Sequence, residues 1–363
     1  MGEHIPGLLL CKRFYQEAVR PILDAVFPGL VHSAGLLGSG SEVLGFDTAR
    51  SSDHHYGPRV FLFLAESEFA GLAPQIDAAL RQNLPVHFLG HSTNFSAPDP
   101  NDSGVRQAVP VEDGPVNHMI EITTARAYFQ GQLGLDPWGE FALEDWLVFE
   151  EQRLRSLVGG QVFHDGLGEL EPLRRKLAFY PTDVWLFLLA AEWTKISQEE
   201  AFVGRTSEVG DELGSRLVTG RLVHSLMRLG FLMEKQYPPY SKWFGTGFAR
   251  LAGAVSLTPA LAGALAASTY PEREGYLCKA YEIVARMHNE LGITAPVAVQ
   301  PSFYFGRPFQ VIHGGTIAGQ IQKGIGDERI RRLPCIGSVN QYLSAVDVLD
   351  DVRLCGKLRA LYS

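Results

Sequence analysis

The amino-acid sequence predicts an α+β protein with a mixed sheet and helices in its first part and helices in its second. Short apolar runs of strand length alternate with helical periods up to about residue 133. Beyond about residue 141, apolar residues recur at helical spacing. The 363 residues suffice for two domains. We therefore expect one domain over residues 1–140 and a larger, all-helical domain over residues 141–363.

The expected elements of the first domain are four strands and three helices. In chain order they are a helix at 8–27, strands at 30–37 and 59–65, a helix at 67–83 capped by Ser67, strands at 85–89 and 118–123, and a helix at 124–133. Residues 91–114 are rich in Asn, Asp, Ser, Pro and Gly, which predicts an exposed loop.

The second part is predicted to consist of helices at 170–179, 182–200, 211–235, 241–252, 273–291 and 338–361. Pro238 and Pro239 separate two of them. Proline lacks an amide N–H and clashes with the preceding helical turn, so it ends a helix. A new helix is therefore expected to begin near Ser241.

The net charge of −8 is unevenly distributed along the chain. Residues 1–150 contain 8 Lys and Arg against 19 Asp and Glu, whereas residues 151–363 contain 24 against 21. Binding to nucleic-acid phosphates needs clustered Lys and Arg, so we expect no sequence-specific nucleic-acid partner. The acidic first part suits a domain that holds a divalent cation, and an acidic surface that only keeps the protein soluble is the alternative.

Cysteine spacing and apolar runs indicate the compartment. The four cysteines are isolated from one another, which favours neither a zinc site nor a disulfide framework. The longest apolar run, 184–191, is far shorter than the ~20 residues that span a bilayer. We expect a cytoplasmic protein with no membrane partner.

A Gly-Ser turn and an aspartate in the first domain form a pattern with chemical meaning. Gly38-Ser39 follows a predicted strand, and 13 residues (40–52) separate it from Asp53, which lies just ahead of another strand. A small turn lets backbone amides and a hydroxyl approach a triphosphate. Acids nearby can hold the Mg²⁺ that bridges the phosphates.

At these residues the sequence resembles the polymerase-β-like nucleotidyltransferases, whose pattern is Gly-Ser, a spacer of similar length, and then Asp-x-Asp or Asp-x-Glu. The resemblance implies that Asp53 and Glu121 are catalytic carboxylates and metal ligands. His55 stands where the family has its second carboxylate, and imidazole suits Mn²⁺ better than Mg²⁺. We therefore expect Mg²⁺ or Mn²⁺ held by Asp53, His55 and Glu121.

Longer runs are similar to an uncharacterised family with the same nucleotidyltransferase fold, catalogued as a domain of unknown function. These runs are Leu44–Thr48, Asp53–Arg59, Gly160–Leu170 and Glu234–Phe244. The resemblance implies an N-terminal nucleotidyltransferase-like domain and suggests its chemistry.

Two groups of residues are expected to bind phosphate in addition to Gly38 and Ser39. Arg59 begins an apolar strand and is interpreted either as a phosphate anchor or as a guard on an edge strand. Tyr240, Ser241 and Lys242 open a predicted helix, whose free amides and dipole attract anions. The alternative for this second group is a plain aromatic contact between helices.

We therefore expect a metal-dependent nucleotidyltransferase. It would transfer a nucleoside monophosphate from a nucleoside triphosphate, expected to be ATP, to a hydroxyl of a small molecule or a protein. The alternative is a non-catalytic nucleotide- or partner-binding protein that retains the fold, because His55 replaces the second metal carboxylate.

Overall fold

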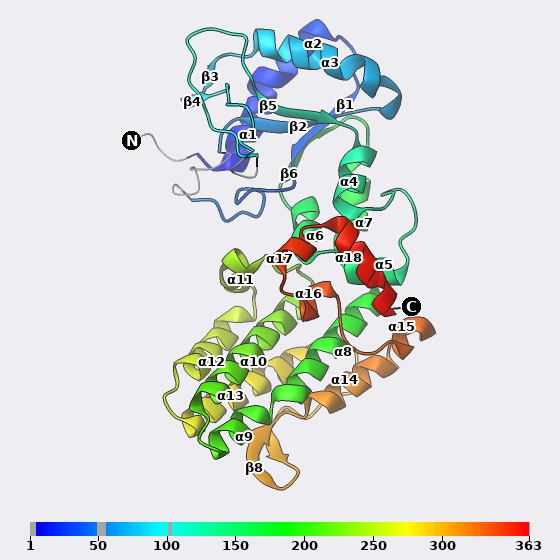
Figure 1. Cartoon of the computed structure of the whole chain (residues 1–363). Helices are drawn as coiled ribbons and strands as arrows, with labels where there is room; N and C mark the ends of the chain where they lie inside the picture. The colour runs from blue at the N-terminus through cyan, green and yellow to red at the C-terminus, as the bar shows by residue number, and fades with distance from the viewer. Residues whose placement is uncertain (1–4, 49–55, 101–103, 363) are drawn as a thin grey trace. The chain divides into compact units, whose positions relative to one another are not determined.

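The computed structural model describes residues 5–48, 56–100 and 104–362. The chain forms two compact units (Figure 1). Unit 1 comprises Met1–Glu140 and Arg153–Ala178, and unit 2 comprises Phe141–Gln152 and Phe179–Ser363. The chain therefore passes between the units three times, where the sequence predicts a single boundary.

A four-stranded mixed sheet with strand order β5-β2-β1-β6 forms the centre of unit 1. β1 (His32–Leu36) pairs antiparallel with β2 (Arg59–Leu64) and with β6 (Gln161–Asp165). β2 pairs in parallel with β5 (Met119–Thr123). A parallel pair needs a crossover connection, and the segment containing α3 (Glu66–Asn83) supplies it. β2 is therefore an internal strand of the sheet.

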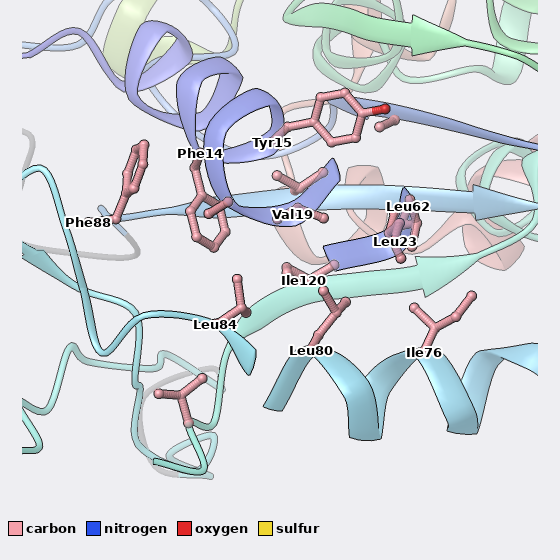
Figure 2. Close-up of a cluster of buried hydrophobic side chains, with 14 of the residues drawn as sticks. Phe14, Tyr15, Val19, Leu23, Leu62, Ile76, Leu80, Leu84, Phe88 and Ile120 are labelled. Atoms are coloured by element: carbon pink, nitrogen blue, oxygen red, sulfur yellow. The ribbon is translucent and has the colours of Figure 1, made fainter. Parts of the chain in front are cut away.

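One face of this sheet carries the hydrophobic core of unit 1 (Figure 2). Helices α1 (Gly7–Phe14), α2 (Arg20–Val26) and α3 cover this face, and a π-helical turn, Tyr15–Val19, joins the first two. Their buried side chains meet the strands in a cluster that includes Phe14, Val19, Leu23, Leu62, Ile76, Leu80 and Ile120. This core fixes which side chains of β2 point inward.

The opposite face of the sheet has a different character. Side chains alternate across a strand, so Arg59, Phe61 and Phe63 point away from the core that Val60 and Leu62 enter. Helix α4 (Ala125–Leu133) lies on this second face, because the ring of Tyr128 contacts both phenylalanines, with centroids 4.9 and 5.6 Å apart. The second face is therefore partly aromatic and partly charged.

The remaining elements of unit 1 correct two expectations. The predicted strand at 85–89 becomes β3 (His87–Phe88), which pairs with β4 (His91–Ser92) outside the main sheet. Helix α3 begins at Glu66 after Ala65, and Ser67 lies inside the helix, so the predicted cap is wrong. Helices α6 (Glu151–Val158) and α7 (Leu170–Lys176) flank β6 along the chain.

Unit 2 is predominantly helical. Its helices are α5 (Leu143–Val148), α8 (Thr182–Glu199), α9 (Phe202–Glu208), α10 (Glu212–Met233), α11 (Ser241–Phe248), α12 (Ala254–Ala266), α13 (Tyr270–Glu290), α14 (Gly314–Lys323), α15 (Glu328–Arg332), α16 (Val339–Tyr342), α17 (Val346–Leu349) and α18 (Val352–Lys357), before a 3-10 turn, Leu358–Tyr362. A hairpin of β7 (Ser302–Tyr304) and β8 (Arg307–Val311) interrupts them.

The α+β class is confirmed, although β6, β7 and β8 depart from the all-helical remainder that the sequence predicts. None of the helices in the part of the chain that the structure describes is long and apolar enough to cross a membrane.

A buried ion-pair network stabilises the core of unit 2. The Nη2 atom of Arg228 on α10 donates to both carboxylate oxygens of Glu151, at 2.9 Å each. Its Nε atom lies 3.4 Å from Oε2 of Glu192 on α8, and that oxygen also accepts a bond from Nε2 of Gln341 (2.7 Å). All three charged side chains are at least 95% buried. Removing the cation would leave two buried carboxylates without their arginine.

Candidate functional site

The predicted Gly-Ser turn follows β1 directly, and its glycines adopt conformations that other residues rarely take. Gly38 has φ +83° and Gly40 has φ +135°. A Cβ atom on Gly38 would stand 2.6 Å from the Tyr128 hydroxyl, and one on Gly40 would stand 2.9 Å from Cδ of Glu42. The backbone conformation and the close neighbours both require glycine at these two positions.

Three consecutive amides of this turn are available to a ligand. The Gly38 N–H donates to the carbonyl oxygen of Ser156 (3.1 Å) and is therefore used by the protein. Within the described parts of unit 1, the N–H groups of Ser39, Gly40 and Ser41 have no hydrogen-bond partner. Ser39 is exposed, and the other two residues are half-buried. Successive free amides in a turn of this kind can bind an anion.

Arg59 holds the turn against the sheet. Its Nη2 atom donates to the carbonyl oxygen of Ser39 (2.8 Å), and its Nε atom donates to Oε1 of Glu42 (3.1 Å), which Nη2 also contacts. The side chains of this ion pair are only 10% and 9% exposed. β2 is internal, so the interpretation of Arg59 as an edge guard is wrong. Its role as a phosphate anchor stays a prediction.

Glu121 lies on the same face of the sheet as Arg59. It stands opposite Phe61 in the parallel register of β2 and β5, and Phe61 and Arg59 are two residues apart on one strand. The residue is exposed. Partial desolvation raises the pKa of its carboxyl group, and the positive charge of Arg59 opposes that rise. The register thus places Glu121, a predicted catalytic carboxylate, on the same face of the sheet as the arginine that holds the turn.

The other predicted metal ligands, Asp53 and His55, lie outside the described residues. Within the described residues, no three His, Cys, Asp or Glu side chains are grouped so that they could hold a metal ion. Of the predicted ligands, the structure thus places Glu121 alone. Asp47, which lies in the same stretch of sequence, accepts a hydrogen bond from the first amide of α1, at Gly7 (2.8 Å).

The second predicted phosphate site lies in unit 2, at the start of α11. The helix begins at Ser241 after Pro238 and Pro239, as the sequence predicts. Tyr240 precedes it, and its N–H donates to Oε1 of Gln152 (3.1 Å). Ser241 and Lys242 are exposed, and the ammonium group of Lys242 lies 5.3 Å from the centroid of the Trp243 ring. These three residues adjoin one another, and their phosphate-binding role stays a prediction.

The structure adds two residues that the sequence analysis missed, Glu42 and Tyr128. Glu42 pairs with a residue 17 positions away, and no local spacing reveals such a partner. The sequence does offer one signal for Glu42. It is a carboxylate three residues after Ser39, in a stretch whose other residues are small or apolar. Tyr128 lies on an ordinary amphipathic helix, and only the packing of α4 on the sheet brings its hydroxyl to Gly38.

Comparison with known proteins finds a match to one family model over part of the chain. Residues 146–244 match a family described as a domain of unknown function (DUF4037). Over those residues the match confirms the resemblance to an uncharacterised family. The crystal structure of a nucleotidyltransferase-like protein from Exiguobacterium sibiricum 255-15 is similar at 10% identity and a TM-score of 0.32, over 77% of this chain and 78% of that one. No curated protein matches the chain.

Proposed function

We propose that this protein binds a nucleoside triphosphate and transfers its nucleoside monophosphate to a hydroxyl group of a small molecule or a protein. One observation carries the proposal. The sheet register places Glu121 on the same face as Arg59, which holds the turn whose three free amides follow Gly38. An anion site and a carboxylate on one face of a sheet suit phosphoryl chemistry.

The proposed reaction is an in-line displacement at the α-phosphate. The acceptor oxygen forms a bond to the α-phosphorus while the bond to the bridging oxygen of pyrophosphate breaks, and the acceptor loses its proton. The amides of Ser39, Gly40 and Ser41 would bind phosphate oxygens. Glu121 would accept the proton, because desolvation makes its carboxylate a stronger base, although Arg59 opposes this effect.

A divalent cation, Mg²⁺ or Mn²⁺, would neutralise phosphate charge when bound. Glu121 would supply one ligand, and Asp53 and His55 are the other ligands that the sequence predicts. Lys242, at the start of α11 in unit 2, is proposed as a phosphate-binding residue in its own right. ATP is the nucleotide that we would test first.

His55 favours a second candidate function, binding of a nucleotide or a protein partner without catalysis. An imidazole in the position of a carboxylate removes one hard oxygen ligand from the predicted site. A binding protein needs the anion site and tolerates this loss, whereas a transferase needs its metal ligands completed by other residues.

Nucleotide binding and transfer can be measured on the same four proteins. Calorimetry with ATP and either Mg²⁺ or Mn²⁺ would compare the wild type with Asp53→Ala, Glu121→Gln and a control, Glu68→Gln. Glu68 is an exposed carboxylate on α3, which covers the opposite face of the sheet. We expect cation-dependent binding to be lost in Asp53→Ala, weakened in Glu121→Gln and unchanged in the control.

Label from the α-phosphate of ATP separates the two candidate functions. Covalent transfer of that label to an acceptor, abolished in Asp53→Ala, would support the transferase. Nucleotide binding without any transfer would favour the non-catalytic protein. Wild-type affinity in folded Asp53→Ala and Glu121→Gln would refute the proposed site.

A further inference from the structure

The hydroxyl group of Tyr128 is buried and has no hydrogen-bond partner in the described parts of the chain. The residue is only 8% exposed, and its Oη atom is inaccessible to solvent. Buried hydroxyl groups in folded proteins nearly always find a partner, because losing water without a replacement is costly. A tyrosine here, where phenylalanine would fill the same space, therefore needs an explanation.

Packing fixes the direction of the Tyr128 ring. Its centroid lies 4.9 Å from that of Phe61, 5.6 Å from that of Phe63 and 5.5 Å from that of Phe129. Contacts with three aromatic rings restrict rotation, and they hold the hydroxyl beside the backbone of Gly38. The 2.6 Å between Oη and the position of a Cβ atom on Gly38 shows how closely the phenol approaches the turn.

Burial above all keeps this phenol protonated. Burial raises the pKa of Tyr128, and the carboxylate of Glu121 raises it further, while Arg59 acts in the opposite direction. A neutral phenol can donate one hydrogen bond. An anion is the natural acceptor, because hydrogen bonds to charged oxygens are stronger than those between neutral groups.

We propose that Tyr128 donates a hydrogen bond from Oη to a phosphate oxygen of a ligand bound by the amides of Ser39, Gly40 and Ser41. This inference rests on the proposed function and extends it, since it assigns a donor that the sequence pattern does not contain. The close approach of the phenol to the turn depends on glycine at position 38, because a Cβ atom there would stand 2.6 Å from the phenol oxygen.

The substitution Tyr128→Phe tests the proposal, with Tyr15→Phe as the matched control. The hydroxyl of Tyr15 is also in a buried residue of unit 1, but it is paired, 2.9 Å from Nε2 of His32. Tyr15 belongs to the core on the opposite face of the sheet. Removing a paired hydroxyl should lower stability, whereas removing an unpaired one should not.

Two measurements on each protein give the outcome. In the absence of ligand, we expect the thermal midpoint of Tyr128→Phe to equal or exceed that of the wild type, and that of Tyr15→Phe to fall. By calorimetry, we expect Tyr128→Phe to bind inorganic tripolyphosphate and ATP at least fivefold more weakly than the wild type. Adenosine affinity should be unchanged, and Tyr15→Phe should bind all three compounds as the wild type does.

Unchanged tripolyphosphate affinity in Tyr128→Phe would overturn the proposal, whatever its midpoint. This result is distinguishable from failure of the proposed function. If Asp53→Ala loses ATP binding while Tyr128→Phe retains it, the nucleotide site stands and the role of Tyr128 falls. If the wild type binds neither ATP nor tripolyphosphate, the proposed function falls, and the ligand assigned to Tyr128 falls with it.

Discussion

Breaking the ion pair between Arg59 and Glu42 should destabilise unit 1 strongly. Glu42→Gln removes the negative charge and leaves the guanidinium group of Arg59 buried, with 10% of that side chain exposed. Loss of one partner of a buried pair typically costs about 3–5 kcal/mol. The Gln side chain can still accept a hydrogen bond from Nε of Arg59, so we expect a cost near the lower limit, about 3 kcal/mol.

Hydrogen exchange of the amides of β1 and β2 is the appropriate assay. Four of the five tryptophans, all except Trp138, belong to unit 2, so fluorescence reports mainly on that unit. A protein of two units also need not unfold in a single step. A loss of about 3 kcal/mol should accelerate globally limited exchange in these strands roughly a hundredfold, at about 1.4 kcal/mol per factor of ten.

An exposed pair in the same unit provides the control. Nε of Arg126 lies 2.7 Å from Oε1 of Glu66, and these side chains are 39% and 54% exposed. Because solvent screens such pairs, Glu66→Gln should cost less than about 1 kcal/mol. In a cycle with Arg59→Met, the double mutant with Glu42→Gln should be more stable than the sum of the single effects predicts. Two results would refute a stabilising role for the buried ion pair of Arg59 and Glu42. One is exchange accelerated less than fivefold by Glu42→Gln, and the other is strict additivity of the two single-mutant effects in the double mutant.

Three further predictions concern both units. Lys242→Met should weaken triphosphate binding roughly ten- to a hundredfold relative to adenosine binding, because a charge-assisted contact contributes ~1.5–3 kcal/mol. Calorimetry would measure both affinities, and an unaltered ratio would exclude Lys242 as a phosphate-binding residue. Arg228→Met should lower the free energy of unfolding of unit 2 by about 3 kcal/mol or more, because it leaves two buried carboxylates without their arginine. Urea unfolding followed by tryptophan fluorescence would measure the loss, and a loss below about 1 kcal/mol would contradict a stabilising role for the buried network. Burial lowers the pKa of four histidines, His32, His118, His224 and His288, below the ordinary value of 6.5. The folded state therefore binds their protons more weakly than the unfolded state does, and thermal midpoints should be lower at pH 5.5 than at pH 7.5. Equal midpoints at the two pH values would count against this reasoning.

The sequence predicts helix ends correctly where a capping side chain or a proline sets them. Thr124 accepts a hydrogen bond from the amide of Ala127 and so opens α4 where the sequence expects a helix. The double proline separates α10 from α11 for the reason that the sequence indicates. The prediction of a cap at Ser67 is wrong because the helix begins at Glu66, one residue earlier than expected. Ala65 therefore occupies the cap position, and its side chain cannot accept a hydrogen bond.

The sequence does not predict the strands and residue partners that depend on contacts between distant segments. β6 is short and half-buried, its residues do not form a continuous apolar run, and it becomes a strand by pairing with β1. The role of Arg59 depends on the order of the strands, because the same residue on an edge strand would face solvent. Partners such as Glu42 and Tyr128 emerge only when the turn, the sheet and α4 are packed together.

The polar groups around the turn divide into those that the protein satisfies and those that it leaves available. The Gly38 amide, the Ser39 carbonyl and the side chains of Arg59 and Glu42 all have partners within unit 1. In the same described region, the amides of Ser39, Gly40 and Ser41 and the hydroxyl of Tyr128 have none. A turn with only a structural role would gain stability from satisfying its donors internally. These four groups can all donate a hydrogen bond, and groups that are already paired hold them in place, which suits the binding of an anion.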